Sequence, residues 1–293
     1  MNSTIQAIQS NPSLEGMVEM SGDILYSLAT GTQLIMRVVT PWSNRFTTES
    51  PPLRPLLVFI QGSAWSTPNL NYQLPQLAFY AQRGYVVATI SHRSIADGHS
   101  APAYLKDIKT AVRFLRAHAE DYRIDKDRVI AFGTSSGGNA ALLLGLTGDA
   151  PRYKTTEYAD ESDRVNAVID CFGPTDLIGL RKMFALANPN AENMPEYQML
   201  AAFCGGNPSE NDTILYEMSP LHILQEGVCY PPIFLLHGDR DTLVPYAQSH
   251  ELYEKLLSYQ QAAQLLRVEN AGHEEDFWSF EVHKQILAFL ETQ

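Results

Sequence analysis

The sequence predicts an α/β fold: a mostly parallel central sheet with helices on both faces, interrupted by one long insertion. Short runs rich in β-branched residues alternate with segments of helical periodicity along most of the 293 residues. Such alternation is typical of parallel strands that are covered on both faces. The length suits one open-sheet α/β enzyme, so we expect a single domain over residues 1–293.

The elements can be placed from short apolar runs and from helical spacing. Core strands are expected at residues 56–60, 85–90, 129–132, 165–169, 233–236 and 264–268, and an antiparallel leading strand at 33–39. Helices are expected at residues 72–82, 105–115, 140–146, 247–258 and 277–290. In the segment 105–115, apolar residues recur three and four positions apart and therefore share one helix face.

Residues 177–225 break this rhythm, being long, partly helical and rich in Asn, Pro and Gly, with Asn188-Pro189-Asn190 as an example. An insertion of this length after a strand is more often functional than idle. It also carries apolar side chains that must pack on something: Met183, Phe184, Leu186, Met194, Tyr197, Met199, Leu200 and Phe203. We interpret it as a cap over the mouth of an active site.

Composition excludes several classes of partner. The formal net charge of −12 disfavours nucleic acid and anionic membranes, because phosphate binding needs clustered Lys and Arg. Residues 1–19 contain neither a basic stretch nor a continuous apolar one, so no signal peptide or anchor is expected, and no run reaches membrane-spanning length. The protein is therefore expected to be soluble and cytoplasmic. Its oligomeric state is unknown from sequence.

The three cysteines, Cys171, Cys204 and Cys229, are an odd number without C-x-x-C spacing. Reduced thiols are the simplest account, and neither a disulfide framework nor a zinc site is expected. Cys171 ends an apolar run and is expected to be a small core residue.

The segment Gly133-Thr134-Ser135-Ser136-Gly137 has the pattern G-x-S-x-G. This pattern alone is common by chance and could be a flexible loop. Here an apolar strand precedes it and an apolar helix follows, which favours a strained turn that presents Ser135 as a nucleophile. The start of that helix would direct free N–H groups towards the place where an oxyanion forms.

Two carboxylates, Asp239 and Asp241, follow the strand at 233–236. The carboxyl ends of parallel strands form the edge where open α/β sheets place their sites. Asp239 comes directly after the strand and is expected to brace the turn. Asp241 lies further out, and we prefer it as the catalytic acid.

His273 follows the strand at 264–268 and stands behind Gly272, which permits a sharp turn. Other histidines have structural explanations, since His118 and His283 lie in helical patterns and His237 lies at a strand end. The chain order Ser135, Asp241, His273 is the nucleophile–acid–base order of α/β-hydrolases.

A fourth motif, Gln61-Gly62-Ser63-Ala64-Trp65, follows the early strand at 56–60. With the other three motifs it resembles the α/β-hydrolase superfamily over roughly residues 55–290. The resemblance is to the esterase and lipase branch, whose oxyanion loop reads H-G-G-G or H-G-G-x-W, and most of all to acetyl- and feruloyl-esterase-like carboxylesterases. It implies an α/β-hydrolase fold.

By position, the resemblance implies that Ser63, Ala64 and Ser136 offer backbone N–H groups to the oxyanion. Gln61 stands where the family has His, and Ser63 where it has Gly. Both changes keep the backbone donors but alter the bracing of the loop. Gln61 and Trp65 are candidates for substrate contact, although Trp65 could equally pack beneath the cap.

These features predict a serine carboxylesterase that hydrolyses small esters, with short acyl or acetyl- and feruloyl-type groups, through an acyl-enzyme. No cofactor or metal is needed. A small serine peptidase of the prolyl-oligopeptidase type is one alternative, but the length leaves no room for a propeller domain. A non-catalytic binding module is another, against which the complete triad argues. The acyl and alcohol groups of the substrate are not readable from the sequence.

Overall fold

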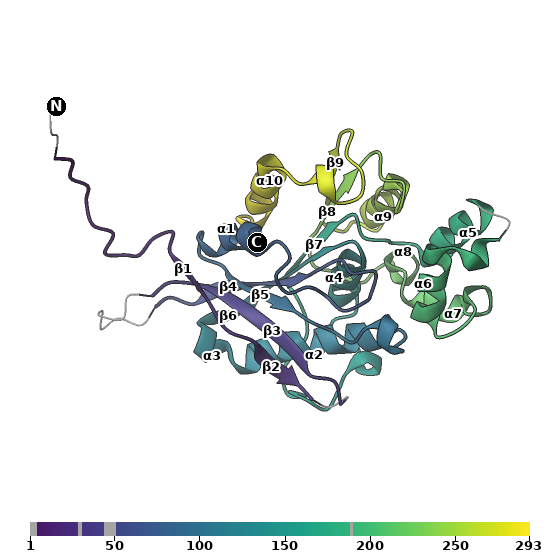
Figure 1. Cartoon of the computed structure of the whole chain (residues 1–293), viewed down its shortest axis with the longest axis horizontal. Coiled ribbons are helices and arrows are strands. Elements are labelled where there is room, and N and C mark those ends of the chain that lie inside the picture. The colour runs from purple at the N-terminus through teal and green to yellow at the C-terminus, as the bar shows by residue number, and fades with distance from the viewer. Residues whose placement is uncertain (1–4, 29–30, 44–50, 188–189) are drawn as a thin grey trace.

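The computed structural model describes residues 5–28, 31–43, 51–187 and 190–293, and a nine-stranded sheet runs through them (Figure 1). The strand order is β1-β3-β5-β4-β6-β7-β8-β9, with β2 paired to β3. The strands are β1 (Val18–Met20), β2 (Ile24–Ser27), β3 (Leu34–Pro41), β4 (Arg54–Ile60), β5 (Val86–Ile90), β6 (Ile124–Thr134), β7 (Ala167–Cys171), β8 (Ile233–Gly238) and β9 (Ala263–Val268).

All six expected core strands are present, and β4 to β9 pair in parallel. The leading strand is also confirmed, because β3 runs antiparallel to β5. The sequence did not predict β1 and β2, which are three and four residues long. Strands this short carry too few residues to show an alternating pattern.

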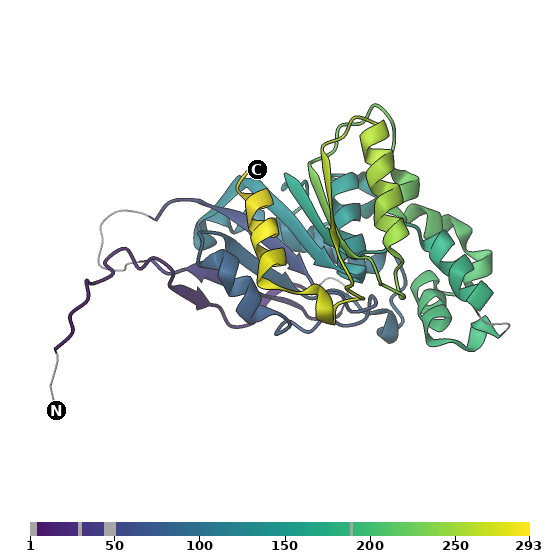
Figure 2. The ribbon, with the colours of Figure 1, turned by 90° about the horizontal axis from the view of Figure 1, so that it is seen from above.

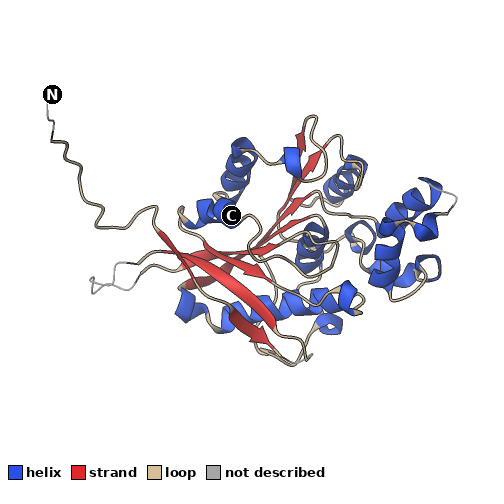
Figure 3. Ribbon diagram, viewed as in Figure 1, coloured by secondary structure: helices blue, strands red, loops and turns tan. Residues whose placement is uncertain are grey.

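Helices cover both faces of the sheet (Figure 3). One apolar core lies under α2, α4 and α9, and the other lies under α1 and α10. The helices outside the insertion are α1 (Leu74–Ala81), α2 (Ala103–Ala117), α3 (Ala119–Tyr122), α4 (Ser136–Leu146), α9 (Tyr246–Ser258) and α10 (Phe280–Leu290), with 3-10 turns η1 (Ile95–Asp97), η2 (Pro151–Tyr153) and η5 (Glu275–Phe277). The last helix begins later than expected because Ser279 caps it, its hydroxyl accepting from the Val282 N–H at 3.2 Å.

The insertion, residues 177–225, forms a group of helices at one end of the molecule, shown in green in Figures 1 and 2. It contains α5 (Leu177–Ala187), η3 (Ala191–Asn193), α6 (Pro195–Cys204), η4 (Pro208–Glu210), α7 (Asp212–Glu217) and α8 (Pro220–Ile223). Leu200 and Phe203 are fully buried, whereas Leu186 is 88% exposed. The segment therefore packs partly on the core and partly faces solvent. Residues 188 and 189, and residues 1–4 of the N-terminal stretch considered above, lie outside the described residues.

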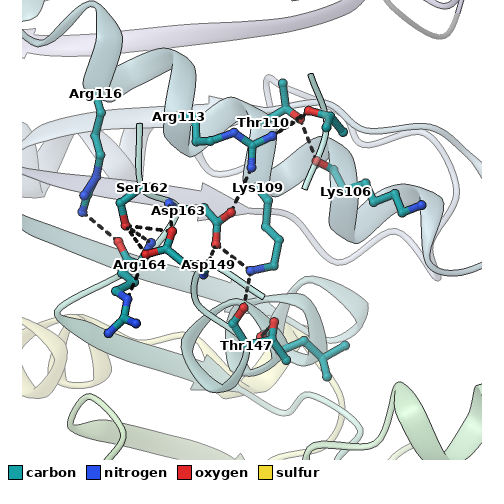
Figure 4. Close-up of polar contacts among 12 residues, drawn as sticks. Lys106, Lys109, Thr110, Arg113, Arg116, Thr147, Asp149, Ser162, Asp163 and Arg164 are labelled. Atoms are coloured by element: carbon teal, nitrogen blue, oxygen red, sulfur yellow. Dashed lines mark hydrogen bonds and ion pairs between the residues drawn. The ribbon is translucent and has the colours of Figure 1, made fainter. Parts of the chain in front are cut away.

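A buried ion-pair network ties α2 to the connection between α4 and β7 (Figure 4). The Asp163 carboxylate binds Lys109 Nζ at 2.7 Å and Arg113 Nη1 at 2.9 Å, and all three side chains are at most 1% exposed. Burial lowers the pKa of Lys109, and the charge of Asp163 opposes that shift. Removing Asp163 would leave two buried cations unpaired, which is usually far more damaging than losing an exposed pair.

The three cysteines are unbridged, with Cys171 buried as expected and Cys229 exposed. Within the described ranges, no helix combines the length and apolar character needed to cross a membrane.

Candidate active site

Ser135 occupies a sharp turn between β6 and α4. Its backbone has φ 51° and ψ −123°, a strained conformation for a residue with a side chain. The expected strained turn between strand and helix is thus present. Two flanking glycines make it possible: a Cβ on Gly133 would lie 2.0 Å from the Gly137 oxygen, and one on Gly137 would lie 2.0 Å from the Ile60 oxygen. No larger residue fits at either position.

The structure brings Ser135, His273 and Asp241 together in a continuous chain of contacts. His273 Nε2 lies 2.9 Å from Ser135 Oγ, and His273 Nδ1 lies 2.6 Å from Asp241 Oδ2. The three residues follow β6, β9 and β8, whose carboxyl ends meet at one edge of the parallel sheet. The side chains are separated by up to 138 positions in the sequence, so the strand order is what gathers them.

Asp241 is held as an anion by its surroundings. It is 7% exposed, and its Oδ1 accepts from the backbone N–H groups of Leu243 and Val244, each at 2.9 Å. Burial raises the pKa of Asp241, but hydrogen bonds with His237 and His273 outweigh burial and hold the pKa well below its usual range. A carboxylate can only accept, so it favours a proton on His273 Nδ1 and leaves Nε2 free to accept from Ser135.

Asp239 lies in the same turn but makes different contacts. Its Oδ1 accepts from the Asn270 N–H at 2.7 Å, and its Oδ2 lies 3.8 Å from Arg267. Both partners belong to β9 or to the loop that carries His273. The side chain thus joins the two loops, in line with its expected role as a brace.

His237, at the end of β8, contacts the Asp241 carboxylate. Its Nε2 lies 3.2 Å from Asp241 Oδ2 and 2.8 Å from the Val244 oxygen, and its Nδ1 lies 2.7 Å from Ser249 Oγ of α9. Its position at the strand end predicts a structural role, but nothing in the sequence predicts this contact. The usable signal was its position four residues before Asp241.

Two further residues, Phe172 and Tyr72, hold the His273 loop and were not found from the sequence. The Phe172 ring meets the His273 ring edge-on, with centroids 4.8 Å apart. The Tyr72 hydroxyl donates to Glu274 Oε1, and burial with this hydrogen bond raises the pKa of Tyr72. These contacts join segments separated by as many as 202 positions, and no local pattern marks them.

The loop at residues 61–65 docks directly on the nucleophile turn. The Gly62 N–H donates to Thr134 Oγ1 at 2.8 Å, and the Ser63 N–H donates to Ser136 Oγ at 2.9 Å. The Ser63 N–H, expected to face the oxyanion, is therefore engaged by the Ser136 side chain. Ala64 has φ 50° and lines the cavity beside Ser135 and Ser136. This geometry narrows the candidate backbone donors to Ala64 and Ser136.

The two candidate substrate contacts differ in position. Gln61 Oε1 accepts from the Asn69 N–H, so the side chain braces its own loop. Trp65 is 2% exposed and packs against Phe203 and Tyr104, with ring centroids 4.5 and 6.4 Å away. It also lines the cavity beside Ser135. Trp65 therefore packs beneath the insertion and also borders the space next to Ser135.

That cavity is small, with a volume of about 60 Å³. It is lined by Ala64, Trp65, Ser135, Ser136, Pro174, Leu180, Phe184, Glu196, Met199, Leu243 and Val244. Four of these residues come from the insertion, which thus supplies one wall of the space next to Ser135. A larger hollow of about 950 Å³ lies between the end of α4 and the helices α7 and α8, and Ser135 is not among its lining residues.

The sheet order and the turn at Ser135 define an α/β-hydrolase fold. Residues 46–256 match the BD-FAE family, and the chain belongs to that family. Over 205 residues it is 30% identical to the Mycobacterium tuberculosis protein named probable carboxylic ester hydrolase LipM, covering 69% of this chain and 44% of LipM. It is 25% identical to esterase LipC of the same organism over 226 residues, covering 75% and 52%.

Solved structures share the fold. A truncated carbohydrate esterase from gut microbiota superposes with a TM-score of 0.75 at 22% identity, covering 97% of this chain and 99% of that one. Esterase Est2 of Thermogutta terrifontis gives 0.71 at 21% identity, covering 95% and 92%. The chain spans about half the length of the curated relatives it matches.

Proposed function

We propose that this protein is a serine carboxylesterase that hydrolyses small carboxylic esters through an acyl-enzyme. The observation that carries the proposal is the chain Ser135–His273–Asp241, with contacts of 2.9 and 2.6 Å. Membership of a family whose matched relatives are named esterases supports the same class of reaction.

In the first half of the reaction, Ser135 Oγ attacks the ester carbonyl while His273 Nε2 accepts its proton. Asp241 holds the imidazole in the required tautomer and stabilises the imidazolium that forms. The charge of Asp241 is available for this because its pKa is held well below the usual range. The C–O bond then breaks, and His273 returns the proton to the leaving alcohol.

In the second half, water attacks the acyl-enzyme with His273 again as base, and the acid is released as Ser135 recovers its proton. The negative oxygen of each tetrahedral intermediate is stabilised by the backbone N–H groups of Ala64 and Ser136. Ser136 is the first residue of α4, where N–H groups have no partner within the helix. Ser63 acts through the hydrogen bond that ties its loop to Ser136.

The insertion acts as a cap that selects the substrate. Its residues Leu180, Phe184 and Met199 give the space beside Ser135 an apolar wall. The space itself is small, with a volume of about 60 Å³. Such a space favours a short acyl or alcohol group over a long chain.

An ester and peptide panel tests the proposal. The purified protein is mixed with 4-nitrophenyl acetate and, separately, with peptidyl 4-nitroanilides. We expect a burst of nitrophenol equal to the enzyme concentration followed by steady turnover, with the anilides much slower. Turnover of the anilides with no ester hydrolysis would replace the proposal with a peptidase, and loss of both activities would favour a non-catalytic module.

A further inference from the structure

We infer that the side-chain hydroxyl of Ser136 is a further catalytic group, which donates a hydrogen bond to the oxyanion alongside the backbone N–H groups of Ala64 and Ser136. The same hydroxyl accepts from the Ser63 N–H at 2.9 Å, so it links that backbone group to the oxyanion. This inference rests on the proposed function and adds one donor to its oxyanion site.

Ser136 stands where the two segments of the oxyanion site meet. It is the first residue of α4, directly after the nucleophile, and it lines the cavity beside Ser135 together with Ala64. Its hydroxyl lies against the loop at residues 61–65, because it accepts from the Ser63 N–H. The hydroxyl and the backbone N–H belong to one residue, so an oxygen atom held by that N–H lies close to the hydroxyl as well.

The Ser136 hydroxyl still has its proton to donate. A hydroxyl carries a donor hydrogen as well as acceptor lone pairs. The Ser63 N–H takes up one acceptor position, and no residue that the structure describes accepts a hydrogen bond from this hydroxyl. The negative oxygen of a tetrahedral intermediate would supply the missing acceptor.

The hydrogen bond from Ser63 makes this hydroxyl a better donor. A hydroxyl that accepts a hydrogen bond is polarised by it and donates more strongly. Side-chain hydroxyls can form part of an oxyanion hole, and donors held in place before the reaction need no reorganisation when the charge develops. The Ser63 N–H therefore contributes to the oxyanion site through Ser136, although its own hydrogen is already engaged.

Thr134, on the other side of the nucleophile, offers a matched comparison. Its Oγ1 accepts from the Gly62 N–H at 2.8 Å, so both hydroxyls dock the same loop on the nucleophile turn. Thr134 is fully buried at the end of β6 and is not among the residues that line the cavity beside Ser135. A docking role alone predicts similar losses from removing either hydroxyl, whereas a donor role predicts the larger loss at Ser136.

The first test compares variants on 4-nitrophenyl acetate. Ser136→Ala removes the hydroxyl, and Ser136→Cys keeps a side chain of similar shape but leaves only a weak donor. We expect kcat to fall on the order of 100-fold in both, with little change in KM, because the bond is made mainly in the transition state. Thr134→Val keeps the shape of its side chain without the hydroxyl, and its loss should be much smaller.

The second test measures the oxyanion itself with ethyl trifluoromethyl ketone. Ser135 Oγ bonds to the ketone carbon, its proton passes to His273, and the ketone oxygen becomes an oxyanion in the same place as that of the intermediate. The inhibition constant should rise in the Ser136 variants by about the factor by which kcat/KM falls. In Thr134→Val it should change much less. Circular dichroism verifies that each variant is folded.

Equal losses in folded Ser136→Ala and Thr134→Val would overturn the inference. An unchanged or higher kcat in Ser136→Ala would also overturn it, because the hydroxyl would then only keep the Ser63 N–H from the oxyanion. So would a fall in kcat without a matching loss of affinity for the ketone. In each case the wild type still hydrolyses esters and the proposed function stands. A folded wild type that neither hydrolyses esters nor binds the ketone would overturn both.

Discussion

The carboxyl edge of the sheet and the insertion differ in how their residues are held. At the sheet edge, the backbone fixes the functional groups: Ser135 sits in a turn that only glycines can flank, and Asp241 accepts two backbone N–H groups. The insertion instead presents side chains from short helices, and it ranges from fully buried Leu200 to Leu186 at 88% exposure.

This difference separates two tasks. Groups at strand ends keep their relative positions because each belongs to the same paired sheet, which is what proton transfer over hydrogen-bonding distances requires. The side chains with which the insertion lines the cavity lie outside the sheet and take no part in its strand pairing. Chemistry should therefore depend on the first region and substrate choice on the second.

Among changes at the carboxyl edge of the sheet, Ser135→Ala should cause the largest loss of activity. By comparison with triad knockouts, kcat should fall on the order of 10⁶-fold, because the nucleophile is lost. The fold should remain, because alanine keeps the Cβ that the turn already accommodates and removes only the hydroxyl. Hydrolysis of 4-nitrophenyl acetate measures the effect, and one per cent residual activity in a folded, pure sample would reject Ser135 as the nucleophile.

Asp241→Asn should lower kcat on the order of 10⁴-fold, because the amide stabilises the wrong tautomer of His273. Asp239→Asn is the matched control in the same turn. Its amide oxygen can still accept from the Asn270 N–H, so the loss should be small. If Asp239→Asn proved the crippling change and Asp241→Asn the mild one, the assignment of the two carboxylates would be reversed.

A buried acid near the sheet edge, Asp170, should make the free energy of unfolding depend on pH. It is fully buried in β7 and accepts from the Gly173 N–H at 3.0 Å, while its Oδ2 has no partner within the described residues. Burial raises the pKa of Asp170 to about 8, which the Gly173 hydrogen bond only partly opposes. The folded protein thus keeps this proton at pH values where the unfolded chain, with a pKa of about 3.9, has lost it.

The sign follows from linkage: wherever the unfolded state binds fewer protons, the free energy of unfolding decreases as pH rises. Stability supplied by the protonated acid should be lost between about pH 4 and pH 8. Between pH 6 and pH 8 the wild type should lose about 2 kcal/mol relative to Asp170→Asn, which cannot ionise. Urea unfolding at both pH values measures this, and parallel pH dependences would show that Asp170 is ionised in the fold.

The smallest effect is expected within the insertion. Phe184 is 5% exposed and lines the cavity beside Ser135, whereas the Tyr197 hydroxyl lies 2.9 Å from Ser209 of the same insertion. Phe184→Ala should enlarge the space and shift kcat/KM towards longer acyl chains by about 10-fold. Tyr197→Ala should change the chain-length profile less. A hundredfold loss of acetate kcat in both folded variants would mean that the insertion takes part in the chemistry.

The two regions also differ in what the sequence could reveal. The core strands, the turn at Ser135 and the loop positions of Asp241 and His273 follow from local patterns, because strand ends and glycine-flanked turns leave short motifs. Contacts between distant segments leave none. The Ser63 N–H donates to the Ser136 hydroxyl, and the Tyr72 hydroxyl donates to Glu274. Both contacts depend on the conformation of the loops, which no local sequence pattern shows.

The sequence showed the insertion as an interruption of the strand–helix alternation. It did not show which residues of the insertion line the cavity beside Ser135. Leu180, Phe184 and Glu196 come to one cavity because α5 and α6 pack together next to Ser135. Their spacing in the sequence follows helix packing rather than a motif, so a single sequence could not place Glu196 next to the nucleophile.

The central claim is that Ser135 is the nucleophile activated by His273 and Asp241. The most direct measurement is the intact mass and peptide map of the protein after reaction with a fluorophosphonate. The account predicts one adduct, on the peptide that carries Ser135, with no adduct on Ser135→Ala and much slower labelling of Asp241→Asn. Stoichiometric labelling of Ser135→Ala at any other serine, or no labelling of the folded wild type, would contradict it.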